Sequence, residues 1–180
     1  MPVEDHKVIK ENRFASYFNR LALAVGAATV LLVTTFSLVS AQSPAALSIG
    51  GLVKAPQSFT LADLQKLPWT TVDATFQTEH GSQHGTWLGV SLWTLLDHAG
   101  GVDASMKDSV RHWLVVTGRD GYAVALSVGE IDPSFGHAAA VVAWSHDGQS
   151  FDPKAGLRLI LPGDRYGARD VRDVVGIEVK

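Results

Sequence analysis

The apolar positions between Ser91 and Gly101 recur at helical spacing. Ser91 is a natural N-cap, three leucines follow at helical intervals, and Gly100 and Gly101 come directly after the last turn. We therefore predict a helix over residues 92–98. The spacing of Thr60 and Asp63 is that of a capping box, so a second short helix is predicted over residues 61–67.

Most other apolar stretches are short, rich in β-branched residues and bounded by Gly, Pro or Asp, which is typical of strands. The stretch 138–144 is apolar throughout, and 157–161 is apolar apart from Arg158; both predict buried strands. Because strands outnumber helices and βαβ units are missing, we expect a β-rich α+β domain, with a mixed sheet or partial barrel and two or more short helices. The predicted strands span residues 47–54, 70–76, 111–117, 122–128, 138–144, 157–161 and 171–179.

A polar segment over residues 78–86 joins a predicted strand to the predicted helix, and it carries His80 and His84. Two histidines four residues apart share one face of a helix and could then bind a metal. Gly81 and Gly85 instead indicate a loop. We therefore interpret the two histidines as solvated or hydrogen-bonding residues and predict no metal site.

Two further loops are rich in groups that suit a planar or anionic ligand. The first contains Asp120 and Tyr122, and the second contains Arg165, Tyr166 and Arg169. A guanidinium group stacks on flat rings and donates in a fork, and tyrosine offers a ring face and a hydroxyl. A plain turn at Asp120 and a solvated loop end at the two arginines remain open alternatives.

The first 41 residues have the layout of an export signal. Basic residues precede an uncharged apolar run over residues 21–39, and small residues follow at 39–41. The run is also close to the length of a membrane span, so an uncleaved anchor is the alternative. In both cases the domain over residues 42–180 is expected outside the cytoplasm, in the periplasm.

Charge and motifs exclude several classes of function. The chain has a formal net charge of −3 and no basic run, so we expect no nucleic-acid partner. Neither GxGxxG nor GxxxxGK[ST] occurs, so the chain lacks a phosphate-binding glycine loop. A GxSxG nucleophile elbow is also missing, which speaks against a hydrolase of that type.

Four motifs occur in an order that is specific as a set. They are SFTLADLQKLP at 58–68, WLGVSLWTLLDHAGG at 87–101, GRDGYAVALSVGEID at 118–132 and GLRLILPGDRYGARDVRDVVGIEV at 156–179. Together they resemble the sulfite-oxidase-type molybdopterin-binding domain over roughly residues 47–179. The resemblance implies the fold of that domain and a cavity shaped for a pterin.

Enzymes of that family hold molybdenum through a cysteine placed after the strand that corresponds to residues 70–76. This chain has no cysteine, and thiolate differs from the other protein ligands in softness. It resembles a group of small periplasmic relatives without this cysteine, which bind a reduced pterin and dock on a membrane-bound cyclic di-GMP enzyme. The resemblance implies a non-catalytic pterin sensor without molybdenum. An oxidoreductase with a non-cysteine metal ligand is the alternative.

A pterin ring needs an acceptor for its N3–H and 2-amino edge and a flat face to stack on. The three polar segments offer carboxylates for the edge, aromatic and guanidinium faces for the ring, and histidine and threonine donors for its carbonyl. The predicted pterin-binding residues are Glu79, His80, His84, Thr86, Trp87, Asp120, Tyr122, Arg165, Tyr166 and Arg169.

Overall fold

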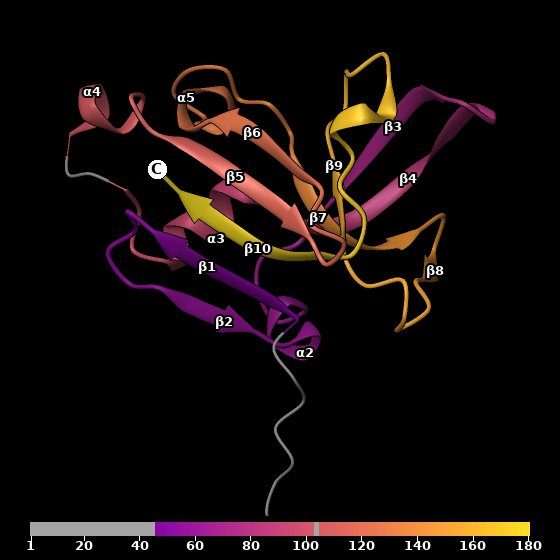
Figure 1. Ribbon diagram of the computed structural model, residues 1–180, viewed down its shortest axis with the longest axis horizontal. Coiled ribbons are helices and arrows are strands. Elements are labelled where there is room, and N and C mark those ends of the chain that lie inside the picture. The colour runs from indigo at the N-terminus through magenta and orange to yellow at the C-terminus, as the bar shows by residue number, and fades with distance from the viewer. Residues whose placement is uncertain (1–45, 103–104) are drawn as a thin grey trace, which may run out of the picture. The chain divides into compact units, whose positions relative to one another are not determined.

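The structure is a computed structural model that describes residues 46–102 and 105–180. The predicted export signal, residues 1–41, lies outside the described residues. Within those two ranges, no helix is both long and apolar enough to cross a bilayer. The described residues form two five-stranded sheets with short helices between the strands (Figure 1). The predicted α+β class is confirmed, with mixed sheets that do not close into a barrel.

The first sheet, sheet A, is mixed. Its parallel pair joins the first and last strands of the domain, so both ends of this part of the chain are held in one sheet. The neighbouring pairs are antiparallel, as their hydrogen-bond registers show. The strand order is β2 (Gln57–Phe59), β1 (Leu47–Gly51), β10 (Val174–Val179), β5 (Trp113–Gly118) and β6 (Ala123–Ser127).

The second sheet, sheet B, is antiparallel throughout. Its two longest strands form a hairpin that extends beyond the rest of the sheet at the right of Figure 1. The order is β3 (Thr70–Thr78), β4 (Gly81–Ser91), β7 (Val141–His146) and β8 (Gln149–Ser150), and β9 (Arg158–Ile160) also pairs with β7.

The two predicted helices are present and begin at their predicted caps. The backbone N–H of Thr94 donates to the Ser91 hydroxyl at 3.0 Å, and Thr60 and Asp63 form the full capping box. Gly100 and Gly101 take positive φ angles directly after the longer helix, as a helix C-terminus favours. The helices are α2 (Leu61–Leu64), α3 (Leu92–His98), α4 (Met106–Ser109), α5 (Val128–Ile131) and the 3-10 helix η1 (Gly167–Arg169).

Strand β7 lies between two hydrophobic clusters, because its alternate side chains enter different cores. Val142 and Trp144 join the larger cluster, which also contains the leucines of α3 and the inner face of sheet A. Val141 and Ala143 join the smaller cluster under the β3–β4 hairpin. The prediction of a fully buried strand here is confirmed. The smaller cluster comprises Ala74, Phe76, Trp87, Val141, Ala143 and Ile160.

The predicted polar loop over residues 78–86 is wrong. Strands β3 and β4 pair without interruption from Thr70 opposite Gly89 to Thr78 opposite Gly81, so only residues 79–80 form the turn. Gly81 has φ 110°, a conformation suited to a tight turn. Cross-strand pairing outweighs the low strand propensity of the glycines. The short elements β2, β8, α4, α5 and η1 also went unpredicted, because each has four residues or fewer.

Candidate functional site

A cavity of about 610 Å³ lies where the turn of the β3–β4 hairpin meets the segment that follows β9. The hairpin supplies one wall, and η1 with its flanking residues supplies the other. Charged, aromatic and amide side chains all reach it, so it offers ring faces together with donors and acceptors. Its lining is Gln77, Thr78, Glu79, His80, Arg158, Tyr166, Gly167, Ala168, Asp170 and Arg172.

A largely buried ion pair, Arg158 with Asp170, contributes to the cavity wall. Nη2 of Arg158 lies 3.5 Å from Oδ2 of Asp170, and the side chains are 15% and 2% exposed. Burial raises the pKa of Asp170 to about 6, although the Arg158 cation partly opposes that shift. Burial also lowers the pKa of Arg158. The free-energy cost of dehydrating these two charges therefore exceeds the stabilisation from their attraction.

Arg158 also lies over the aromatic rings of the smaller core. Its guanidinium carbon is 4.8 Å from the ring centroid of Trp87 and 5.5 Å from that of Phe76, within the range of a cation–π contact. Nη2 donates to the side chain of Gln83 at 3.2 Å. Its Nε is buried without a hydrogen-bond partner among the described residues.

Tyr166 presents the most open ring at the cavity, with 58% of the residue exposed. The Arg165 guanidinium lies over this ring at 5.5 Å. The segment is attached to the hairpin, because the N–H of Gln77 donates to the carbonyl of Arg165 at 2.9 Å. Gly167 packs so close to Phe76 that a Cβ would lie 2.8 Å from the ring. A side chain there would push the segment off the hairpin.

Two further contacts hold the 164–170 segment from its other side. Arg169 donates to both carboxylate oxygens of Asp164 and to Glu130 at 3.1 Å. Hydrogen bonding to Asp164 raises the pKa of Arg169. The hydroxyl of Tyr122 donates to the carbonyl of Ala168 at 2.6 Å. Arg169 and Tyr122, both predicted to contact the pterin, are thus engaged in positioning this wall of the cavity.

The structure brings three of the predicted residues together at the cavity. Glu79 and His80 come from the hairpin turn, and Tyr166 comes from the opposite wall. Arg165 adjoins them through the ring of Tyr166. They are separated in sequence by more than 80 positions, and pairing at Gln77 brings the two segments together.

The remaining predicted residues do not line this cavity. His84 and Thr86 lie on the exposed face of β4, on the opposite side from Trp87. Trp87 is 1% exposed, and His146 stacks on its indole with ring centroids 4.0 Å apart. The carboxylate of Asp120 accepts from the N–H of Tyr122 at 2.9 Å, which is the turn role left open by the sequence.

The sequence analysis missed three charged residues of the cavity: Arg158, Asp170 and Arg172. The sequence did contain a signal for Arg158. Arg158 interrupts the otherwise apolar run LRLIL of a strand predicted to be buried, and a charge in such a place needs a partner. Asp170 and Arg172 carried no such signal, because a charged residue is ordinary in a loop and at the beginning of a predicted strand.

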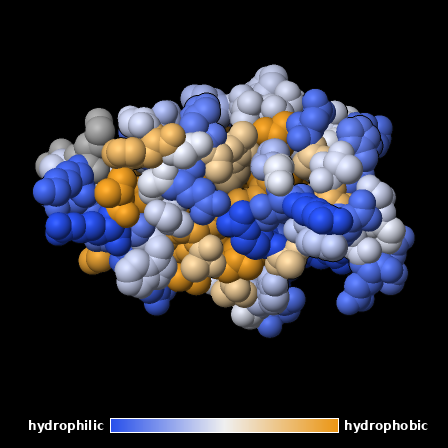
Figure 2. All heavy atoms as spheres, turned by 90° about the horizontal axis from the view of Figure 1, so that it is seen from above, coloured by the Kyte–Doolittle hydropathy of each residue, from blue (hydrophilic) through white to orange (hydrophobic). Residues whose placement is uncertain are grey.

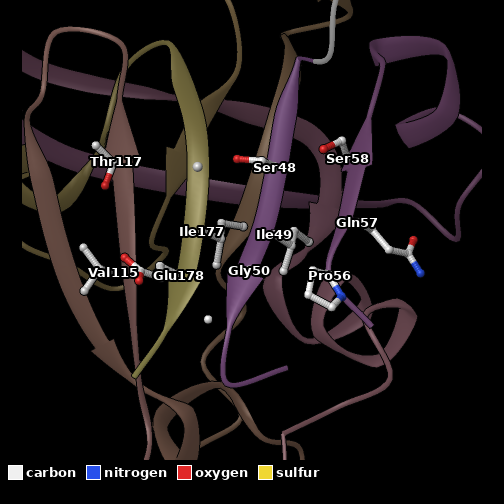
Figure 3. A pocket seen from close by; sticks show the side chains of 12 residues that line it. Ser48, Ile49, Gly50, Pro56, Gln57, Ser58, Val115, Thr117, Ile177 and Glu178 are labelled. Atoms are coloured by element: carbon white, nitrogen blue, oxygen red, sulfur yellow. The ribbon is translucent and has the colours of Figure 1, made fainter. Parts of the chain in front are cut away.

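Two other hollows lie elsewhere among the described residues. One of about 490 Å³ lies on the outer face of sheet A, and Figure 3 shows mostly small side chains such as Ser48, Ser58 and Thr117 around it. Another, of about 640 Å³, lies beside α2 and also brings together rings and charges, namely Trp144 and Phe151 with Arg119, Lys154, Asp152 and Asp173. The face in Figure 2 mixes hydrophilic and hydrophobic residues without one large apolar area. The cavity at the hairpin turn is the one that combines exposed ring, buried guanidinium and carboxylate.

The fold agrees with comparisons against known proteins. Residues 39–180 match the model of the oxidoreductase molybdopterin binding domain. The chain belongs to this family. Among solved structures it is similar to the sulfane dehydrogenase SoxCD from Paracoccus pantotrophus, with 22% identity and a TM-score of 0.62. The match covers 74% of this chain and 37% of that chain, and it supports the fold. No curated protein matches.

Members of this family bind the molybdopterin cofactor, so its two parts can be tested against the residues present. The organic part fits, since the cavity offers an open ring at Tyr166, a carboxylate at Glu79 and the guanidinium of Arg158 in its wall. The metal lacks a thiolate ligand, because the chain contains no cysteine. Among the described residues, no group of three or more His, Asp or Glu is placed to hold a metal ion.

Proposed function

We propose that this chain is a non-catalytic, periplasmic pterin-binding protein that reports a reduced pterin to a membrane-bound signalling partner. The observation that carries the proposal is the cavity at the hairpin turn, in a domain of a molybdopterin-binding family that has no cysteine. A pterin without its metal needs ring and edge contacts but no thiolate, and the cavity supplies both kinds of contact.

In this proposal the pterin ring stacks on Tyr166, and its amino edge donates to a carboxylate. Glu79 and Asp170 both reach the cavity. Glu79 is the better acceptor, because Asp170 already accepts from Arg158 and from the N–H of Leu161. Arg158 and Arg172 then donate to the ring carbonyl or to an anionic substituent.

The partner that we propose is an enzyme that makes or breaks cyclic di-GMP and exposes a domain on the outer side of the membrane. The support is the resemblance in size, export signal and missing cysteine described above.

The proposal is tested by titrating purified residues 42–180 with tetrahydrobiopterin under anaerobic conditions in a calorimeter. We expect binding of the wild type and weakening of about 10- to 100-fold in Glu79→Gln, since a hydrogen bond to a charged group contributes about 1.5–3 kcal/mol. Asp120→Asn is the matched control, because this carboxylate lies outside the cavity lining. Its affinity is expected to stay unchanged.

Two results would overturn the proposal. One is the absence of any bound pterin by mass spectrometry of small molecules released from protein purified from its native periplasm, together with no heat of binding. The other is a stoichiometric amount of molybdenum by elemental analysis. That second result would establish the alternative, an oxidoreductase with a non-cysteine metal ligand.

A further inference from the structure

Strand β3 forms an open edge of sheet B. It is nine residues long and stands first in the sheet order, with β4 on one side. On the other side, the segment at Arg165 and Tyr166 pairs with Gln77 alone. From Thr70 to Phe76, no strand of the described residues pairs with this outer edge (Figure 1).

Two observations establish which backbone groups point out of the sheet. The N–H of Gln77 points outward, because it donates to the carbonyl of Arg165 at 2.9 Å. In β4, the N–H of Thr86 donates to the Asp147 carboxylate, and the carbonyl of Thr86 accepts from the N–H of Asp147, at 2.8 Å in both cases. The backbone groups of Thr86 therefore point away from β3. Its partner Asp73 must then direct its own N–H and carbonyl to the free edge, since these groups alternate along a strand.

The same alternation assigns outward backbone groups to Thr71, Asp73 and Thr75. All three residues are exposed. Their side chains share the solvent face of the hairpin, where Thr86 donates to Asp73 at 2.5 Å and Thr75 bonds to His84 at 2.7 Å. The open edge therefore has fixed side chains beside unpaired donors and acceptors. Thr86 and His84 form the second row of this face.

Proteins usually protect a long edge strand with proline, lysine, a bulge or a covering segment. The sequence of β3, TTVDATFQT, contains neither proline nor lysine. Its register with β4 is continuous over all nine residues, so it has no bulge. The outermost strands of sheet A, β2 and β6, have three and five residues. Among these edges, β3 offers the longest row of unpaired backbone groups, and Asp73 is its one charged residue.

We propose that the outer edge of β3 binds an extended segment of a protein partner as an added strand. Main-chain hydrogen bonds to residues 71–75 would supply affinity, and alternate side chains would supply specificity. On the inner face the partner's apolar side chains would extend the row of Val72, Ala74 and Phe76. On the outer face a basic side chain would meet the carboxylate of Asp73.

A second copy of this chain fits the edge poorly. The two-fold antiparallel pairing that uses all three outward residues sets Thr71 against Thr75 and Asp73 against its own copy. Two carboxylates directly opposite each other repel. Charge complementarity therefore favours a different protein, one whose strand carries a basic residue at that position. The inference does not require that the cavity binds a pterin.

The test is a selection of nine-residue peptides displayed on phage against residues 42–180, carried out without pterin. We expect enrichment of peptides in which apolar residues alternate with polar or basic ones. Thr71→Pro removes an outward N–H without breaking a bond to β4, and we expect at least about tenfold weaker binding of the selected peptides. The matched control Thr71→Ala keeps that N–H, and its affinity should stay within about twofold of the wild type.

A second variant covers the case in which Thr71→Pro does not fold, as judged by circular dichroism. Asp73→Lys should weaken the binding of basic peptides by about tenfold and leave the binding of neutral peptides unchanged. The inference is overturned if no peptides are selected, or if the selected peptides bind the folded Thr71→Pro variant or Asp73→Lys as tightly as the wild type. It is also overturned if sedimentation shows a dimer that Thr71→Pro abolishes, because a second copy then occupies the edge.

Discussion

Arg158 and Asp170 form an ion pair whose side chains are largely removed from water, with Nη2 of the arginine 3.5 Å from Oδ2 of the aspartate. The pair connects the cavity to the smaller hydrophobic core, because the same guanidinium lies over Trp87. Burial raises the pKa of Asp170 to about 6 in spite of the nearby cation. The pair is therefore a place where the fold tolerates an unfavourable charge.

This pKa predicts a specific dependence of stability on pH. The folded state holds the Asp170 proton more tightly than the unfolded chain, so the contribution of this group to the free energy of unfolding falls as pH rises from about 4 to about 6. The loss is on the order of 3 kcal/mol. Asp170→Asn lacks this titration. Urea unfolding at pH 4, 5, 6 and 7 should show the wild type losing stability relative to the variant as the pH rises. If the free energies of unfolding of the two proteins change with pH in the same way, Asp170 does not have the raised pKa.

Arg169 is expected to stabilise the cavity wall rather than to bind ligand directly. Arg169→Gln loses the two hydrogen bonds to the Asp164 carboxylate and the hydrogen bond to Glu130. Because the guanidinium is partly exposed, the cost should be about 1 kcal/mol. Hydrogen exchange should accelerate in residues 164–170. Arg165→Gln is the control, since Arg165 makes no ion pair with a carboxylate among the described residues; equal effects of both changes would refute the difference in role.

Gly85 accommodates the stacking of His146 on Trp87. A methyl group at this position would overlap the His146 ring and approach Asp147, so Gly85→Ala should cost about 1–3 kcal/mol and change the fluorescence of the buried indole. Gly50→Ala introduces the same methyl group where nothing lies within 4 Å. The prediction is wrong if the two substitutions have the same effect on urea unfolding and on the emission spectrum.

Ser91 is expected to determine the stability of the start of α3. Its hydroxyl accepts from the N–H of Thr94 at 3.0 Å, and loss of an N-cap costs about 1 kcal/mol. Ser91→Ala should lower the free energy of unfolding by that amount in a urea titration. Ser82→Ala removes a serine hydroxyl from an exposed position in β4 and should leave stability unchanged. No difference between the two variants would exclude a capping role.

Local chemistry made helices α2 and α3 and the buried strand β7 predictable. Ser91 caps α3 and the Thr60–Asp63 box caps α2 because each motif acts within four residues. The hairpin was missed for a related reason. His84 and Thr86 alternate with Gln83 and Gly85 at a period of two, but two glycines within a polar stretch looked like a loop. Pairing with β3 supplies the hydrogen bonds that the local sequence does not favour.

The sequence by itself determined the α+β class, the family and the lack of a thiolate, because these depend on local motifs and on composition. The tertiary structure alone decided which polar residues meet. Arg158 reaches Gln83 across 75 positions of the chain, and the bridge from Gln77 to Tyr166 brings the two cavity walls together. Such contacts arise from strand register between distant segments. Periodicity within one segment shows which of its residues face the core, but it does not identify the distant segment with which that strand pairs.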